Sequence, residues 1–460
     1  MAAEGTVTDP GLRLEHGAIQ LDPAGDLWIE GTRAADLADR FGTPLYVTSE
    51  AQLRQSYREL HHAFASRYPR VAILYANKAN GNLAVRRILT QEGAGGDCFG
   101  IGELTLALRA GTPASLLALN GSNKQPAELR LAIEVGATIN IDHPTEVERV
   151  ASIAEALGRR ARINLRILPF TYADVPRLDP DNAAVATDRS HDKWGMDPPT
   201  ALEAASRALA LPQVELRGLH LHVSRLRPTT APFELAARLL LRAVDELRRE
   251  TGWTPRLLDL GGGFAQPRDP ESGTPPRGHE VSTAEAYAEA ITPVLLDGFR
   301  ERDTEPPEVW IEPGRRLVGS STVLLTRVGL VKRLPSSSAT WVNVDASTNH
   351  LMRIPLQGYW HAVIPVVDAR RPGSIVATVV GPNCTLDAFA VDRALPPVAE
   401  GELLAVLDVG AYAEAFVSRF NLIPRPATVL VHQREAEVIR RRETIEDLFE
   451  GQEVPPRLRD

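Results

Sequence analysis

The chain has 460 residues, a formal net charge of −8 at pH 7 and two cysteines, Cys98 and Cys384. Because acidic and basic residues are interspersed and no basic stripe stands out, nucleic acids and anionic membranes are poor candidates as partners. Two thiols do not make a disulfide framework, and we find neither a secretion signal nor an apolar run of bilayer length, so we expect a protein of the reducing cytoplasm.

Two short strand-like segments, at 18–21 and 27–29, open the chain. From about residue 70 to 320, apolar strand-like runs then alternate with amphipathic helical segments. The predicted strands are VAILYA (71–76), GGDCFG (95–100), SLLALNG (115–121), ATINID (137–142), ARINLRI (161–167), VELRGLHLHV (214–223), RLLDLGGG (256–263) and EVWIEPG (308–314). The longest predicted helix, 231–252, ends at Gly252, a typical stop signal.

Eight strand–helix units in some 250 residues predict a (β/α)8 TIM-like barrel. An open doubly wound sheet has the same rhythm. The barrel is favoured because Lys78, His222, Gly261–Gly263 and Glu312 all fall at or just beyond strand C-termini, which a barrel brings to one face.

After about residue 320 the helical rhythm stops, and five segments have the pattern of strands separated by turns. They are 321–334, 340–347, 361–369, 374–383 and 403–412. We therefore expect three parts: residues 1–45 complete a β domain, 46–318 form the barrel, and 319–460 form the rest of the all-β domain. The Pro/Gly-rich stretches at 176–182 and 267–278 are expected to be surface loops.

A lysine, three glycines and a glutamate stand at predicted strand ends. Lys78 follows VAILYA directly, where its amine either reaches solvent or takes part in chemistry. Gly261–Gly263 can turn their N–H groups toward a phosphate, or form a flexible turn. Glu312 either pairs with Arg315 or holds a proton on a heterocyclic nitrogen. Together these groups at one barrel mouth indicate pyridoxal phosphate.

His220 and His222 alternate along one predicted strand, which would also suit a metal pair. A metal-dependent hydrolase is therefore an alternative. It would need further ligands, and we find no second His/Asp cluster at suitable spacing. Stacking on a flat cofactor, or a core position, is the favoured interpretation of these histidines, and no metal is expected.

Nine motifs occur in an order that resembles the diaminopimelate and ornithine decarboxylase family. They are YANKAN, GGDCFGIGEL, HDKWGM, GLHLHVS, LDLGGGF, IEPGR, DASTNHLMR, GPNC and DVGAYAEAFVSRFN, from about residue 40 to 425. The resemblance implies an alanine-racemase-like fold, a TIM-like barrel with a β domain, and pyridoxal-phosphate-dependent decarboxylation of an amino acid.

The resemblance also assigns roles to the strand-end residues. Lys78 binds the cofactor covalently, through an amine that must be partly desolvated and neutral to attack a carbonyl. His222 stacks on the pyridine ring. Glu312 pairs with the ring nitrogen and keeps it protonated, whereas the family's racemases place an arginine there. Further cofactor contacts are implied for Asp97, Gly261, Gly262, Gly263, Gly314, Arg315 and Tyr412.

Cys384, in GPNC, matches the cysteine that returns a proton to the substrate carbon. A thiol, with a reference pKa of about 8.5, is mostly protonated at neutral pH, as a proton donor must be; a small buried apolar residue is the alternative. In relatives this cysteine comes from the β domain of the partner subunit, so the resemblance implies an obligate homodimer with shared sites. Tyr412 is expected to contact phosphate or substrate.

The substrate pocket both follows and departs from the family. Arg353 and Arg315 match arginines that bind a distal carboxylate in diaminopimelate decarboxylases, a task suited to the guanidinium fork; structural ion pairs are the alternative. However, Gln357 replaces a tyrosine, and Thr385 replaces the acidic residue that contacts the distal amine. A site that loses such a partner loses discrimination.

Two further departures lie nearby. The spacing from Cys384 to Asp387 is one residue short, and Arg225 stands where the family has Gly-Ser. We therefore expect an amino acid with a distal carboxylate, and leave open a larger substrate of specialised metabolism, such as a siderophore or antibiotic precursor. An ornithine-, lysine- or arginine-type decarboxylase and an inactive regulatory homologue remain alternatives.

Overall fold

The computed structural model describes residues 14, 17–168, 193–222, 229–266, 281–334, 336, 339–372 and 374–459. The described residues form two compact units. One contains those from Leu53 to Leu317, and the other contains those up to Gln52 and from Val318 onward. Arg225 and the predicted loops at 176–182 and 267–278 lie outside the described residues.

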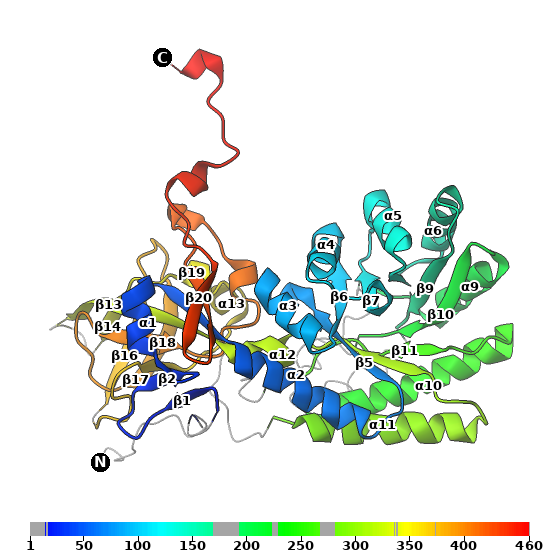
Figure 1. The fold of residues 1–460 in the computed structure, drawn as a ribbon, viewed down its shortest axis with the longest axis horizontal. Coiled ribbons are helices and arrows are strands. Elements are labelled where there is room, and N and C mark those ends of the chain that lie inside the picture. The colour runs from blue at the N-terminus through cyan, green and yellow to red at the C-terminus, as the bar shows by residue number, and fades with distance from the viewer. Residues whose placement is uncertain are drawn as a thin grey trace. The chain divides into compact units, whose positions relative to one another are not determined.

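The first unit is a closed barrel of eight parallel strands, which confirms the predicted fold class (Figure 1). Its strands are β5 (Val71–Ala76), β6 (Gly95–Phe99), β7 (Leu117–Asn120), β8 (Thr138–Ile141), β9 (Ala161–Arg166), β10 (Val214–His220), β11 (Leu257–Asp259) and β12 (Glu308–Ile311). All eight lie within the segments predicted from the sequence. The barrel closes where β12 pairs with β5, Ile311 opposite Ile73.

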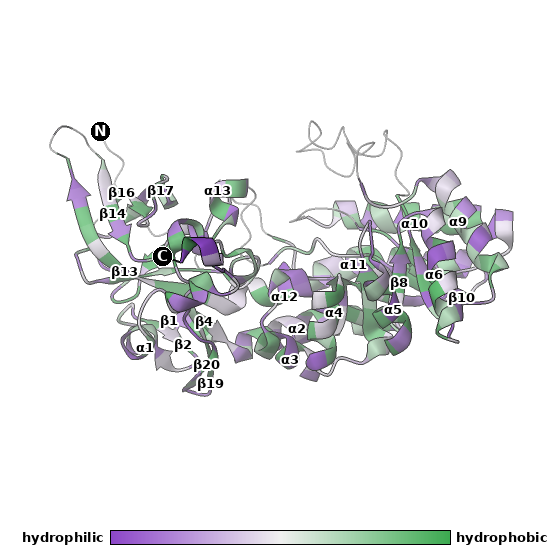
Figure 2. Cartoon of the chain, turned by 90° about the horizontal axis from the view of Figure 1, so that it is seen from above, coloured by the Kyte–Doolittle hydropathy of each residue, from purple (hydrophilic) through white to green (hydrophobic). Residues whose placement is uncertain are grey.

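Helices lie on the outside of the barrel, the first of them before β5 and the others after the barrel strands. They are α2 (Glu50–Ala65), α3 (Leu83–Gln91), α4 (Ile101–Arg109), α5 (Pro126–Val135), α6 (Pro144–Ala156), α9 (Pro198–Ala210), α10 (Ala231–Thr251), α11 (Ala284–Glu301) and the short α12 (Arg315–Val318). As predicted, α10 stops at Gly252, which caps it in the left-handed conformation with φ 71°. Figure 2 shows hydrophilic and hydrophobic segments side by side on these helices, because one stripe of each packs on the strands.

The interior of the barrel changes from apolar to polar along its strands. Leu74, Ala118, Leu257 and Trp310 form a buried apolar cluster inside it. Side chains two residues apart on a strand point to the same face. The positions two residues beyond three of these, Asn120, Asp259 and Glu312, therefore also face inward, but at the C-terminal end where the chemistry of such barrels takes place.

The second unit contains a nine-stranded sheet. Seven strands run in the order β17 (Ala388–Leu395), β16 (Ile375–Val380), β14 (Thr340–Val344), β13 (Thr322–Arg333), β4 (Leu45–Ser49), β19 (Ala427–His432) and β20 (Glu435–Arg440). Off this path, β18 (Leu403–Val406) pairs with β13 and with β15 (Val363–Pro365). The sequence identified β13, β14, β15, β16 and β18 but missed β4, β17, β19 and β20.

The opening strands form a small sheet of their own, β1 (Ile19–Leu21), β2 (Leu27–Ile29) and β3 (Thr32–Arg33). Ile19, Leu27 and Ile29 share a buried core with Val323 and Val429 of the larger sheet. We retain the division into an N-terminal segment, a barrel and a C-terminal β domain as a proposal. Among the described residues, no helix combines the length and apolarity needed to cross a membrane.

Candidate active site

Lys78 lies in a single turn, Asn77–Ala79, directly after β5. Its Nζ is 2.6 Å from Oδ2 of Asp97, on the neighbouring strand β6, and 4.6 Å from the centre of the Phe99 ring. The Lys78 side chain is 36% exposed, whereas Asp97 is fully buried. The Lys78 amine therefore lies at the barrel mouth, partly exposed and paired with a fully buried carboxylate.

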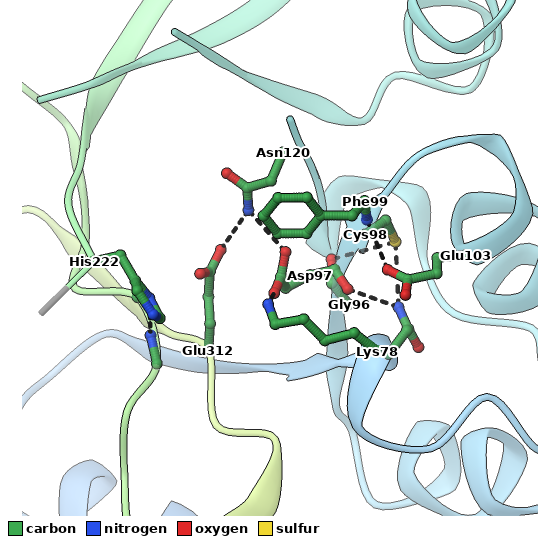
Figure 3. A network of polar contacts seen from close by, with 12 residues as sticks. Lys78, Gly96, Asp97, Cys98, Phe99, Glu103, Asn120, His222 and Glu312 are labelled. Carbon is green, nitrogen blue, oxygen red and sulfur yellow. Dashed lines mark hydrogen bonds and ion pairs between the residues drawn. The ribbon is translucent and has the colours of Figure 1, made fainter. Parts of the chain in front are cut away.

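Glu312 lies just after β12, and its carboxylate points into the barrel (Figure 3). Oε1 accepts a hydrogen bond of 2.9 Å from Nδ2 of Asn120, and Oε2 lies 3.3 Å from Nε2 of His220. The same Nδ2 of Asn120 donates to Oδ1 of Asp97 at 2.8 Å. One amide group thus joins the acid beside Lys78 to the acid predicted to bind the ring nitrogen.

The surroundings shift the pKa values of these buried acids in opposite directions. Burial alone would raise the pKa of Glu312, but His220 and Lys78 outweigh burial and lower this pKa well below its ordinary value. Burial, followed by the charge of Glu312, raises the pKa of Asp97 and raises that of Asp259 further. An ionised, buried carboxylate at the position of Glu312 suits a partner that carries a proton on a ring nitrogen.

His222 lies against the glycine turn. Nδ1 of His222 accepts a hydrogen bond of 3.0 Å from the N–H of Gly262, so the ring proton of the neutral imidazole is on Nε2. Burial and then the charge of Lys78 lower the pKa of His222 to about 3, so the ring is neutral at physiological pH. A neutral ring suits stacking on a cofactor whose own nitrogen is positively charged.

The glycine turn leaves no space for side chains. A Cβ at Gly261, whose φ is 65°, would lie 2.5 Å from the carbonyl oxygen of Leu221, and a Cβ at Gly262 would lie 2.5 Å from that of Glu312. Gly263 also has a positive φ of 107°. The turn therefore packs directly between Leu221, just after β10, and the Glu312 segment. The N–H of Gly261 donates to Oδ1 of Asp259 at 2.9 Å and that of Gly262 to His222, so among the described residues only the N–H of Gly263 in this turn has no acceptor.

The loop after Glu312 is anchored to the same region. Gly314 precedes α12, and Arg315 at the start of α12 is buried. Nη1 of Arg316 donates to the carbonyl oxygens of Ala265 at 3.0 Å and Ser282 at 3.2 Å. These residues fit pyridoxal phosphate: a lysine amine at the mouth, an ionised buried acid, a neutral histidine and a glycine turn in one barrel.

Cys384 and its neighbours lie in the β unit. Nδ2 of Asn421 is 3.3 Å from the exposed thiol of Cys384 and 2.8 Å from Oδ1 of Asn383. Asp387 is buried and accepts hydrogen bonds from Ser347 Oγ, from both Thr348 donors and from Asn383 N–H, at 2.5–3.0 Å. The loop that carries Cys384 is thus fixed by Asp387 despite its shortened spacing, and Thr385 next to the thiol is exposed.

Arg353 and Tyr412 come together in the same unit. The Arg353 guanidinium lies 4.8 Å from the ring centre of Tyr359 and 4.7 Å from that of Tyr412, and its Nε donates to Oε1 of Gln357 at 2.6 Å. Gln357, the position that departs from the family, therefore contacts the predicted carboxylate-binding arginine directly.

The sequence missed several residues of the barrel site. Asn120 ends a buried strand, the same signal that identified Lys78, and Glu103 on α4 accepts from the N–H of Phe99 at 2.7 Å. Sequence spacing showed no second His/Asp cluster, but the fold brings one together: one ligand atom each of His220, Asp259 and Glu312 lies within 4.8 Å of the others. These acids stand singly at the ends of separate strands, so sequence spacing does not reveal the cluster.

Comparisons with known proteins support the cofactor. The family model "Pyridoxal-dependent decarboxylase, pyridoxal binding domain" matches residues 53–319. The diaminopimelate decarboxylase of Methanothermobacter thermautotrophicus is 36% identical over 442 residues, covering 96% of this chain and 98% of the relative. That of Archaeoglobus fulgidus is 34% identical over 433 residues, covering 94% and 98%.

Solved structures agree. The crystal structure of diaminopimelate decarboxylase from M. jannaschii superimposes with a TM-score of 0.88 at 31% identity, over 96% of this chain and 99% of that one. AQ1208 from Aquifex aeolicus gives a TM-score of 0.81 at 30% identity, over 94% and 97%. With a barrel site that fits the cofactor, the chain belongs to the pyridoxal-dependent decarboxylases, in the family of the diaminopimelate and ornithine decarboxylases, and is a pyridoxal-phosphate-dependent carboxy-lyase.

Proposed function

We propose that this enzyme removes the α-carboxylate of a diamino acid that carries a second, distal carboxylate. The observation that carries the proposal is the pairing of the Lys78 amine at the barrel mouth with the ionised carboxylate of Glu312, joined through Asp97 and Asn120. When bound, the cofactor supplies a protonated pyridine ring that withdraws the electrons released as the carboxylate leaves as carbon dioxide.

In this proposal the chain's own residues bind, orient and protonate. Lys78 binds the cofactor covalently, the carboxylate of Glu312 holds the proton on the ring nitrogen, and the neutral ring of His222 lies against the cofactor face. The N–H of Gly263 and the segment of Gly314 and Arg315 bind the phosphate, while Gly261 and Gly262 let the turn pack close enough to reach it. Asp97, already paired with Lys78, keeps the lysine amine in place.

We propose that Cys384 returns a proton to the substrate. Loss of carbon dioxide leaves an electron pair on the α-carbon, and the Sγ–H bond of Cys384 breaks to supply the proton; solvent then reprotonates the thiolate. The thiol is exposed and oriented by Asn421. Leu386, two residues after Cys384, and Phe420 and Leu422, on either side of Asn421 in the chain, are 64%, 49% and 52% exposed.

Exposed apolar side chains gathered around a reactive group are typical of an interface. We therefore propose a homodimer in which Cys384 of one copy serves the barrel of the other. Size-exclusion chromatography with light scattering tests this: a monomer that retains full activity contradicts it. A cytoplasmic location remains part of the proposal.

The distal carboxylate is proposed from Arg353. Tyr359 and Tyr412 lie against its guanidinium and Gln357 holds its Nε, so the fork is oriented before substrate arrives. The relatives of highest identity reported above are named diaminopimelate decarboxylases, and the M. jannaschii enzyme has been solved in complex with L-lysine. Loss of one carboxyl group from diaminopimelate leaves lysine, so meso-diaminopimelate is the first substrate to test.

Gln357 and Thr385 favour a second candidate, a larger carboxylated amino acid of specialised metabolism. Thr385 is exposed and carries no charge to pair with a distal amine. A decarboxylase of ornithine, lysine or arginine would not need Arg353, and an inactive homologue would not need Lys78, Glu312 and Cys384 together.

Carbon dioxide release from meso-diaminopimelate, lysine, ornithine, arginine and larger conjugated amino acids tests these alternatives. Activity on diaminopimelate that falls in Arg353→Lys through a raised KM supports the proposal. Activity only on substrates without a distal carboxylate contradicts it. Borohydride reduction followed by peptide mapping should place the cofactor on Lys78, and Lys78→Ala should lack the visible band; a colourless wild-type protein would refute the cofactor role.

A further inference from the structure

Three buried asparagines form a line of hydrogen bonds across neighbouring barrel strands. Asn164 on β9 donates from Nδ2 to Oδ1 of Asn140 on β8 at 3.0 Å, and Asn140 donates in the same way to Asn120 on β7 at 2.9 Å. Each of the three is at most 1% exposed. We call Asn120, Asn140 and Asn164 the asparagine ladder.

The ladder has one polarity, which its acidic end determines. The carboxylates of Asp97 and Glu312 only accept hydrogen bonds in their ionised form, so Asn120 must turn Nδ2 toward them, as Figure 3 shows. Its Oδ1 then faces Asn140 and must accept. Asn140 therefore donates from Nδ2 and presents its Oδ1 to Asn164, which must in turn donate from Nδ2. The Oδ1 of Asn164 then has no hydrogen-bond partner among the described residues.

Such an arrangement aligns three amide dipoles with their positive ends toward the two acids. Inside a protein, consecutive hydrogen bonds polarise one another and are electrostatically stronger than in water. Rotating any one amide by half a turn would place two donors or two acceptors face to face. The fixed amide of Asn120 therefore sets both the separation and the orientation of the two carboxylates.

We propose that the asparagine ladder is a positioning device, in which Asn140 and Asn164 lock the amide of Asn120 so that it holds the carboxylates of Asp97 and Glu312 in place for Lys78 and the cofactor nitrogen. None of the three asparagines has to touch the substrate. This inference rests on the proposed roles of Lys78 and Glu312.

Other charged groups face the same two acids. They are Lys78 after β5, Glu103 on α4, His220 and His222 at and just beyond the end of β10, and Asp259 on β11; Arg166 on β9 acts on His222. All of these remain unchanged in variants of the ladder, so a difference among those variants reports the amides.

The test uses cofactor-free full-length protein titrated with pyridoxal 5'-phosphate, and compares Asn120→Leu, Asn140→Leu and Asn164→Leu, which keep side-chain size but remove the amide. Thr138→Val is the matched control, because it removes a buried hydroxyl from the same strand as Asn140 without touching the ladder. We expect Kd to rise roughly tenfold or more in Asn120→Leu, since a bond to a charged group is lost, and about two- to fivefold in the other two.

The graded, same-direction response is the decisive result. The rise in Kd should be larger for Asn140→Leu than for Asn164→Leu. The pH at which the visible band of the bound cofactor changes should shift by amounts in the same order. If Asn140→Leu and Asn164→Leu match Thr138→Val in Kd and in band position, the inference is overturned, whether or not Asn120→Leu folds. If peptide mapping instead finds the cofactor on a lysine other than Lys78, the proposed function fails first.

Discussion

Replacing Glu312 by glutamine should remove the negative charge of this side chain while keeping its size, so it separates the two contributions to catalysis. The Glu312 carboxylate uses both oxygens, one accepting from Asn120 at 2.9 Å and the other 3.3 Å from His220 Nε2. A glutamine amide can keep its oxygen toward Asn120 and turn its NH2 group toward His220. His220 can then accept by moving its proton to Nδ1, which has no hydrogen-bond partner among the described residues.

The magnitude follows from this geometry. Both contacts can be rebuilt, but the proton on Nδ1 of His220 is then buried without an acceptor, so the free energy of unfolding should fall by about 1–3 kcal/mol. A hydrogen bond to a charged group contributes about 1.5–3 kcal/mol and a neutral one about 0.5–1.5 kcal/mol. Losing the charge should therefore weaken the contact with the protonated ring nitrogen by about 1–2 kcal/mol, which lowers kcat about 5- to 30-fold.

The assay is steady-state carbon dioxide release with saturating cofactor, accompanied by urea unfolding. Glu308→Gln, at the opposite end of the same strand β12, is the control for the substitution itself. A Glu312→Gln variant that is fully active would refute the role of the charge. One that is destabilised by clearly more than about 3 kcal/mol would refute the rebuilt hydrogen bonds.

Three further outcomes are expected. Cys384→Ala should lower kcat roughly a hundredfold to ten-thousandfold without changing the Kd for the cofactor; equal loss of both would contradict its role as proton donor. Burial raises the pKa of Glu103 to about 7 from 4.5, so the folded protein keeps a proton that the unfolded chain releases. Its stability should thus fall by about 1–3 kcal/mol between pH 4.5 and 7, and urea unfolding of Glu103→Gln should lack this slope. Lys124 is buried with Nζ 3.0 Å from both oxygens of Glu146, so Lys124→Met should lower the free energy of unfolding in urea by about 3–5 kcal/mol, because it leaves the Glu146 carboxylate buried without a partner. Lys124→Met/Glu146→Leu should recover part of this loss; no recovery would show that the unpaired carboxylate is not its cause.

Local chemistry made the barrel predictable. Each of its strands is a short β-rich apolar run bounded by turn residues. α10 has helical spacing up to Gly252, whose left-handed conformation favours glycine because it has no Cβ. The ends of those strands also identified Lys78, His222, the glycine turn and Glu312 as a group, because parallel strands in a barrel deliver their C-termini to one face.

The strands of the β unit were harder to assign. β4, at Leu45–Ser49, pairs with β13 and β19, which follow it by more than 250 residues. Its own residues contain no information about those partners, since sheet pairing between distant segments is set by the whole domain. β17 and β20 were missed because they are the edge strands of the sheet, where exposed residues break the apolar pattern. β19 is an interior, almost fully buried strand between β4 and β20, and its apolar run ATVLVH was a strand signal that the sequence analysis overlooked.

By itself, therefore, the sequence determined the fold class and which residues stand at the barrel mouth. Only the tertiary structure decided that His220 rather than His222 contacts Glu312, and that Asn120 joins Glu312 to Asp97. These contacts depend on which strands are neighbours and on their register in the closed barrel. They join residues far apart in the chain, so a local sequence pattern cannot predict them.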